Sequence, residues 1–224
     1  RRRGMIYGAR GDYDAAIGDA TAAIDATPDN ASAYVDRSTY LMGKFRTAEA
    51  IADLTTALDL SPEMAVAYYD RGIAYGRMGK SDLALADYNA AIARDPTMAL
   101  AYTNRSALEY AASDYDSALA DADRAIQLKP DSVAALGNRG TLFALRRDFA
   151  NGLADWEMVI NLRPGDPDGY SGRAAILLAE GDYAGAIRDY DKSIALSPTV
   201  TAYQGRGVAR MALGQNRGAA DYFE

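Results

Sequence analysis

Residues 67–96 decide the fold, and they read AYYDRGIAYGRMGKSDLALADYNAAIARDP. Two stretches of helical length, each with apolar residues three or four positions apart, flank the turn at Gly79-Lys80. Pro96 ends the second stretch, because proline cannot donate the backbone hydrogen bond that would continue a helix. The segment therefore predicts a helical hairpin that is closed by a proline.

This hairpin recurs with a period of 34 residues. Six prolines lie at that spacing, namely Pro28, Pro62, Pro96, Pro130, Pro164 and Pro198. A fixed period of this size is the signature of stacked structural repeats. We therefore expect one domain over residues 1–224, with about seven units at 1–30 (partial), 31–64, 65–98, 99–132, 133–166, 167–199 and 200–224 (partial).

Stacking the units on one another gives columns of like residues. Aromatic side chains dominate one column on the first helix: Tyr34, Tyr68, Tyr102, Leu136, Tyr170 and Tyr203. Small residues fill a second column of that helix (Ser38, Gly72, Ser106, Gly140, Ala174 and Gly207) and a facing column of the second helix (Ala50, Ala84, Ala118, Gly152, Ala186 and Ala219). Small residues on both helices predict that the two approach closely.

These columns resemble the tetratricopeptide repeat family over essentially the whole chain. The resemblance implies an all-α fold, a right-handed superhelical solenoid of stacked antiparallel helix pairs, with a concave groove lined mainly by the first helices. Two positions depart from the pattern. Gly43 stands two residues before the place of the other turn residues, so we expect that hairpin to bend differently. The step from Pro198 to Tyr203 is one residue shorter than its equivalents, so we expect a changed stacking angle there.

The sole tryptophan, Trp156, takes the place that Leu54, Tyr88, Ala122 and Tyr190 hold in other units. Gly152 and Leu136 stand nearby where other units carry alanine and tyrosine. Volume gained at Trp156 would then be offset by volume lost beside it, as a packed core requires. We interpret Trp156 as a core residue; a ligand platform is the alternative.

Composition excludes several classes of function. A net charge of −7 argues against nucleic acid, because binding to phosphates depends on clustered lysine and arginine. Histidine and cysteine are both absent, which removes the commonest proton shuttle, thiol nucleophile and zinc ligands, so we expect no enzyme activity, metal or cofactor. No run of 18 apolar residues exists, so no membrane insertion is expected. The sequence does not indicate a compartment.

One arginine recurs on every first helix, and one aspartate recurs on the second helices. The arginines are Arg37, Arg71, Arg105, Arg139 and Arg173, and the aspartates are Asp53, Asp87, Asp121, Asp155 and Asp189. We predict a structural ladder of ion pairs, each within a unit or between adjoining units. The alternative is a row of arginines that is offered to an acidic ligand.

A groove on the first helices is the candidate binding site. Its expected residues are Asp36, Tyr69, Asp70, Ile73, Arg77, Asn104, Tyr110, Asn138 and Leu145. The resemblance implies that asparagines on this face bind the backbone of an extended peptide; the two aspartates could only accept hydrogen bonds. The alternative is that these polar residues are merely solvated.

Three functions are compatible with this pattern. The first is a non-catalytic adaptor that binds a peptide segment of a partner protein in the groove. The second is a structural subunit of a larger assembly, packed through its convex face or through ends that lack capping helices. The third is a non-catalytic part of an enzyme whose active domain lies elsewhere.

Overall fold

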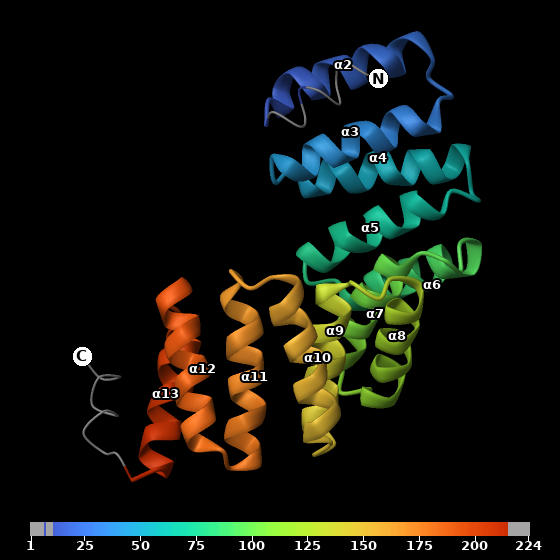
Figure 1. Ribbon diagram of the computed structural model, residues 1–224. Helices are drawn as coiled ribbons and strands as arrows, with labels where there is room; N and C mark the ends of the chain where they lie inside the picture. Colours follow the sequence, from blue (N-terminus) through green and yellow to red (C-terminus); the bar gives the residue numbers. More distant parts are fainter. Residues whose placement is uncertain (1–6, 8–10, 215–224) are drawn as a thin grey trace. The chain divides into compact units, whose positions relative to one another are not determined.

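The computed structural model describes residue 7 and residues 11–214, and in this part of the chain it contains twelve α-helices and no strand (Figure 1). The helices are α2 (Tyr13–Ala26), α3 (Ala31–Gly43), α4 (Thr47–Leu60), α5 (Ala65–Arg77), α6 (Ser81–Arg94), α7 (Ala99–Ala111), α8 (Tyr115–Leu128), α9 (Val133–Leu145), α10 (Phe149–Leu162), α11 (Pro167–Glu180), α12 (Tyr183–Leu196) and α13 (Val200–Ala212). The predicted all-α fold of repeated helical hairpins is confirmed.

The chain divides into two compact units, Arg1–Leu108 and Glu109–Glu224, here called unit 1 and unit 2. In unit 1 each of the helices α2 to α5 packs against the next helix along the chain. The helices α8 to α13 of unit 2 pack in the same consecutive way (Figure 1). That the two units form one continuous solenoid stays a prediction.

A left-handed residue occupies the same place in every hairpin turn. These residues are spaced 34 positions apart, and their φ angles are positive: Phe45 (59°), Gly79 (70°), Ser113 (64°), Arg147 (61°) and Gly181 (100°). The expectation that Gly43 serves as an early turn residue was wrong. Gly43 is the last residue of α3, and a Cβ on it would lie 2.7 Å from the ring of Tyr13. Its smallness makes room for that ring, while Phe45 forms the turn.

Phe45 carries this conformation although it is a bulky residue, and 87% of its surface is exposed. A left-handed conformation costs about 1–2 kcal/mol for an ordinary L-residue, while glycine adds about 0.5–1 kcal/mol of chain entropy to the unfolded state. We expect Phe45→Gly to stabilise the protein by roughly 0.5–1 kcal/mol, measured by urea unfolding. Phe45→Ala is the control: it also removes the ring but keeps the strain, and an equal gain there would contradict this account.

The shortened step after Pro198 is absorbed in the turn. The helix α13 begins two residues after its proline, whereas α3, α5, α7, α9 and α11 each begin three residues after theirs. Thr199 caps the shortened start, because its Oγ1 accepts a hydrogen bond from the backbone N–H of Ala202 at 3.2 Å. The expected change in stacking angle stays a prediction.

Trp156 is half-buried and its ring packs against α9 and α11 of unit 2, but the residues that make room for it differ from those expected. A Cβ added to a neighbouring glycine would lie close to the Trp156 ring, at 3.1 Å for Gly137, 2.9 Å for Gly140 and 2.5 Å for Gly172. Gly152, by contrast, lies against the side chain of Ile176 and the carbonyl of Gly140. The tryptophan therefore rests in a cradle of three glycines, and Gly152 serves the close approach of α9 and α10.

Candidate functional site

Four arginines of the first helices each hold an aspartate sixteen residues further on. Nε and Nη2 of the arginine donate to the two carboxylate oxygens at 2.6–2.9 Å in the pairs Arg37–Asp53, Arg71–Asp87, Arg139–Asp155 and Arg173–Asp189. All four aspartates are buried. This bidentate geometry is the strongest form of a charged hydrogen bond in proteins. Arg105 lies in unit 1 and Asp121 in unit 2, so that rung stays a prediction.

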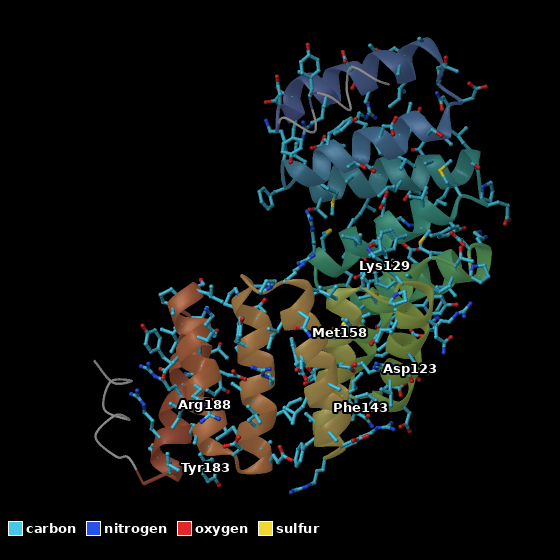
Figure 2. The ribbon with its side chains drawn as sticks, in the orientation of Figure 1. Asp123, Lys129, Phe143, Met158, Tyr183 and Arg188 are labelled. Carbon is cyan, nitrogen blue, oxygen red and sulfur yellow. The ribbon has the colours of Figure 1, made fainter. Side chains whose placement is uncertain are left out.

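The third nitrogen of the guanidinium reaches the second helix of the preceding repeat. Nη1 of the arginine donates to a side-chain oxygen at 2.6–3.3 Å in the pairs Arg37–Thr21, Arg71–Thr55, Arg105–Asn89, Arg139–Asp123 and Arg206–Asp191. The residues around one of these arginines, Asp123 and Phe143, are labelled in Figure 2. Each arginine therefore joins two neighbouring repeats, and its donors are directed into the protein rather than toward an acidic ligand.

Four of the six predicted groove residues in unit 1 line a common cavity. Asp36, Asp70, Ile73 and Arg77 line one cavity of about 600 Å³ together with Tyr13, Ser38, Thr39, Tyr40, Met42 and Gly43. The helices α2, α3 and α5 supply all of these side chains. Tyr13 was not anticipated from the sequence; the signal was Gly43, whose missing side chain admits the tyrosine ring. The cavity has carboxylates, one guanidinium and apolar or aromatic walls.

Asp70 is the least satisfied charge in this cavity. Within the described part of the chain it takes part in no hydrogen bond or ion pair, and burial raises the pKa of its carboxyl from 3.8 to about 6. Arg77 lines the same cavity but forms no ion pair with Asp70 within the described residues. Its Nη1 donates to the carbonyl of Met42 at 3.0 Å, near the C-terminus of α3. At neutral pH the cavity therefore holds an ionised carboxylate that no described residue pairs with.

This charge lowers the stability of the fold. The folded pKa of about 6 exceeds the ordinary 3.8, so the penalty is complete above about pH 6 and is relieved as the pH falls through that window. We expect Asp70→Asn to raise the free energy of unfolding at pH 7 by about 1–2 kcal/mol, a figure reduced for the solvent that the cavity admits. Urea unfolding at pH 7 and pH 4 measures it. The gain should shrink toward zero at the lower pH, and Asp29→Asn, in an exposed turn of the same unit, should show neither effect.

Asn104 and Tyr69 bind each other in unit 1. Nδ2 of Asn104 donates to the hydroxyl of Tyr69 at 3.3 Å, and Asn104 also hydrogen-bonds Tyr88, whose pKa burial raises to about 12. The rings of Tyr69 and Tyr88 lie 6.0 Å apart. An asparagine held in this way fixes the positions of two tyrosines, and a peptide would have to compete for its amide.

The remaining groove residues belong to unit 2. Tyr110 lies 5.8 Å from Tyr115 between ring centroids, and Leu145 lines a separate cavity of about 360 Å³ with Asp114, Asp116 and Arg146 among its walls. Both Tyr110 and Leu145 are exposed, and Asn138 is half-buried. Of the predicted residues, four therefore line the cavity of unit 1, Asn104 and Tyr69 bind each other, and Tyr110, Asn138 and Leu145 belong to unit 2.

Within the described residues, no group of three or more metal-ligating side chains is placed to hold an ion. Two neighbouring carboxylates of the first described hairpin have other contacts: Asp12 caps α2, and Asp14 pairs with Lys44. No helix in residues 11–214 combines the length and the apolar character that a bilayer crossing needs.

Comparison with known families agrees with this geometry. A tetratricopeptide repeat model matches residues 1–65, 36–99, 69–133 and 106–167, and a second model of the same repeat matches 167–200. The chain belongs to the tetratricopeptide repeat family. Members of this family are generally non-catalytic scaffolds for protein interaction, and they bind protein partners. No protein of curated function matches the sequence.

Solved tetratricopeptide repeat structures share the fold. A tetratricopeptide repeat protein from Parabacteroides merdae superposes with a TM-score of 0.77 at 25% identity, over 99% of this chain and 88% of that one. PilF from Pseudomonas aeruginosa gives a TM-score of 0.74 at 21% identity, over 86% and 88% of the two chains. YrrB, described as a repeat protein with an unusual peptide-binding site, gives 0.69 at 20% identity, over 87% and 97%.

Proposed function

We propose that this tetratricopeptide repeat chain is a non-catalytic adaptor that binds an extended peptide segment of a partner protein in the cavity of unit 1. The observation that carries the proposal is the convergence of Asp36, Asp70, Ile73 and Arg77 on one cavity of about 600 Å³. Binding sites are typically concave, with apolar walls and a few polar groups that fix orientation. The unusual peptide-binding site of YrrB, a protein of the same fold, supports a peptide as the ligand class.

The shape of the cavity favours a segment of chain over a globular surface. Its walls come from the first helices α3 and α5 and from α2, so it is a recess between neighbouring repeats rather than a flat patch. Met42, Ile73 and the two tyrosines offer apolar contact, while the carboxylates and the guanidinium of Arg77 can bind backbone or side-chain polar groups. A side chain of an extended peptide can enter such a recess with its backbone on the rim.

The test fills the cavity with a large side chain. Thr39 lines the cavity and is exposed, so Thr39→Trp is expected to block entry without disturbing the core. Thr56→Trp on α4 is the matched control: in both threonines Oγ1 donates to the carbonyl four residues earlier at 3.1 Å, but Thr56 does not line the cavity.

A phage-displayed library of random dodecapeptides would be selected on the wild-type chain, and the Kd of each enriched peptide would be measured by fluorescence polarisation. We expect Thr39→Trp to weaken binding by at least about tenfold, a loss of about 1.4 kcal/mol, and Thr56→Trp to leave it within about twofold. Circular dichroism would establish equal helicity. No enriched peptide, or equal binding by both variants, would overturn the proposal and favour the alternative, a subunit packed through its convex face or its ends.

A further inference from the structure

Among the described residues, two carboxylates and one guanidinium line the cavity of unit 1. Asp36 on α3 and Asp70 on α5 are equivalent residues of consecutive repeats, 34 positions apart, and both line it. Arg77 is the basic residue of this lining within the described residues, and its Nη1 donates to the carbonyl of Met42. The described lining therefore carries a net negative charge at neutral pH.

The neighbouring arginines of the ladder cannot supply the missing positive charge. Arg37 is bound to Asp53 and Thr21, and Arg71 is bound to Asp87 and Thr55. Their guanidinium groups are therefore directed into the contacts between repeats. Asp70, which has no hydrogen bond or ion pair within the described residues, is left for a group from outside.

The cost of Asp70 is itself an argument for a ligand. Burial disfavours the ionised carboxylate, as its raised pKa of about 6 shows, and no interaction within the described fold offsets this. Charges that reduce stability without compensation are characteristic of functional sites, where a partner supplies the missing interaction. A cation that paired with Asp70 would remove this penalty when it bound.

The walls match the stem of a long basic side chain. Tyr13 and Tyr40 contribute aromatic rings, and Met42 and Ile73 contribute apolar surface, beside the carboxylates. Lysine and arginine carry three or four methylene groups that pack on apolar surface while the charged head reaches a polar group. Aromatic faces also attract cations. A net charge of −7 on the whole chain adds a general attraction for basic segments.

We propose that the cavity between α3 and α5 takes a lysine or arginine side chain of the partner peptide, with its cationic head on Asp70 and its stem against Met42, Ile73 and the two tyrosines. This inference rests on the proposed peptide-binding function and names its anchor. An acidic side chain or a free C-terminal carboxylate is disfavoured in the same place, because it would meet like charges.

The test is a double-mutant cycle on the peptides that the random library yields. Each peptide is made with its lysine or arginine intact and with that residue replaced by norleucine, which keeps an apolar stem and removes the charge. Both are titrated by fluorescence polarisation against the wild-type chain, Asp70→Asn and Asp29→Asn. The variant Asp70→Asn is expected to fold, since it removes a destabilising charge, and Asp29→Asn makes the same change in an exposed turn.

We expect Asp70→Asn to raise the Kd of the basic peptide by about tenfold. The Kd of the norleucine peptide should stay within about twofold of its wild-type value. Asp29→Asn should change neither, and 0.5 M salt should reduce the difference. Two results would overturn the basic anchor and leave the peptide-binding function standing. In the first, peptides whose binding is blocked by Thr39→Trp contain no basic residue; in the second, such peptides bind Asp70→Asn as tightly as the wild type. If Thr39→Trp leaves peptide binding unchanged, or if no peptide is enriched, both the basic anchor and the peptide-binding function are overturned.

Discussion

Replacing Trp156 by alanine is expected to lower the free energy of unfolding of the protein by about 3 kcal/mol, the lower end of the range for truncating a large aromatic core residue because the ring is only partly buried. The ring rests on Gly137, Gly140 and Gly172, and glycines cannot move side chains into the space that it leaves. The cavity would therefore stay largely open, and its cost would add to the lost apolar burial.

Urea unfolding followed by circular dichroism measures this loss, since the variant has no tryptophan to report by fluorescence. Met158→Ala on the same helix is the control: 49% of Met158 is exposed, and it should cost less than about 0.5 kcal/mol. Gly172→Ala tests the same contact by adding volume instead of removing it, because its Cβ would lie 2.5 Å from the Trp156 ring. A loss below about 1 kcal/mol for Trp156→Ala would mean that the ring contributes to a surface instead of the core.

Removing Asp87 should cost unit 1 nearly as much. Asp87→Ala leaves Arg71, whose side chain is 18% exposed, with the hydroxyl of Thr55 as its remaining hydrogen-bond acceptor within the described residues. Breaking a buried ion pair costs about 3–5 kcal/mol because a charge is left behind; we expect about 2–3 kcal/mol here, since Arg71 keeps some solvent.

The equivalent change in unit 2 provides the comparison. Asp155→Ala leaves Arg139 bound to the carboxylate of Asp123 at 2.8 Å, so it should cost about 1 kcal/mol less than Asp87→Ala. The double variant Arg71→Leu/Asp87→Leu should recover much of the loss, because no unpaired charge remains. Urea midpoints of the three variants and of the wild type decide between these outcomes. Equal losses at Asp87 and Asp155 would contradict the role given to Asp123.

The repeat period was sufficient to predict most of the fold. Prolines 34 residues apart placed the hairpins, and the aromatic and small columns identified which faces of the helices meet. The turn at Phe45 was missed because the sequence contains a nearby glycine, and a glycine is the usual choice for a left-handed residue. The neighbouring Gly43 is small for a different reason, the approach of Tyr13, which only the structure reveals.

The candidate site was harder to predict. Columns place Asp36, Asp70, Ile73 and Arg77 on one face. They do not show that Arg77 binds the carbonyl of Met42, or that Asp70 lacks a partner among the residues that the structure describes. These facts depend on side-chain conformations and on α2, whose contribution of Tyr13 lies outside the first-helix pattern. The pairing of Asn104 with Tyr69 was hidden for the same reason, since it joins residues 35 positions apart.

The arginine bridge bears on how such a chain can lengthen. Arg71 is bound to residues sixteen positions before and sixteen positions after it, and both distances are shorter than the 34-residue period. A tandem duplication of one whole repeat would therefore give the new arginine its own aspartate and an acceptor from the copy before it. The array can grow by gene duplication without evolving a new contact, and a divergent acceptor, such as threonine in place of aspartate, changes the strength of one junction while leaving the others intact.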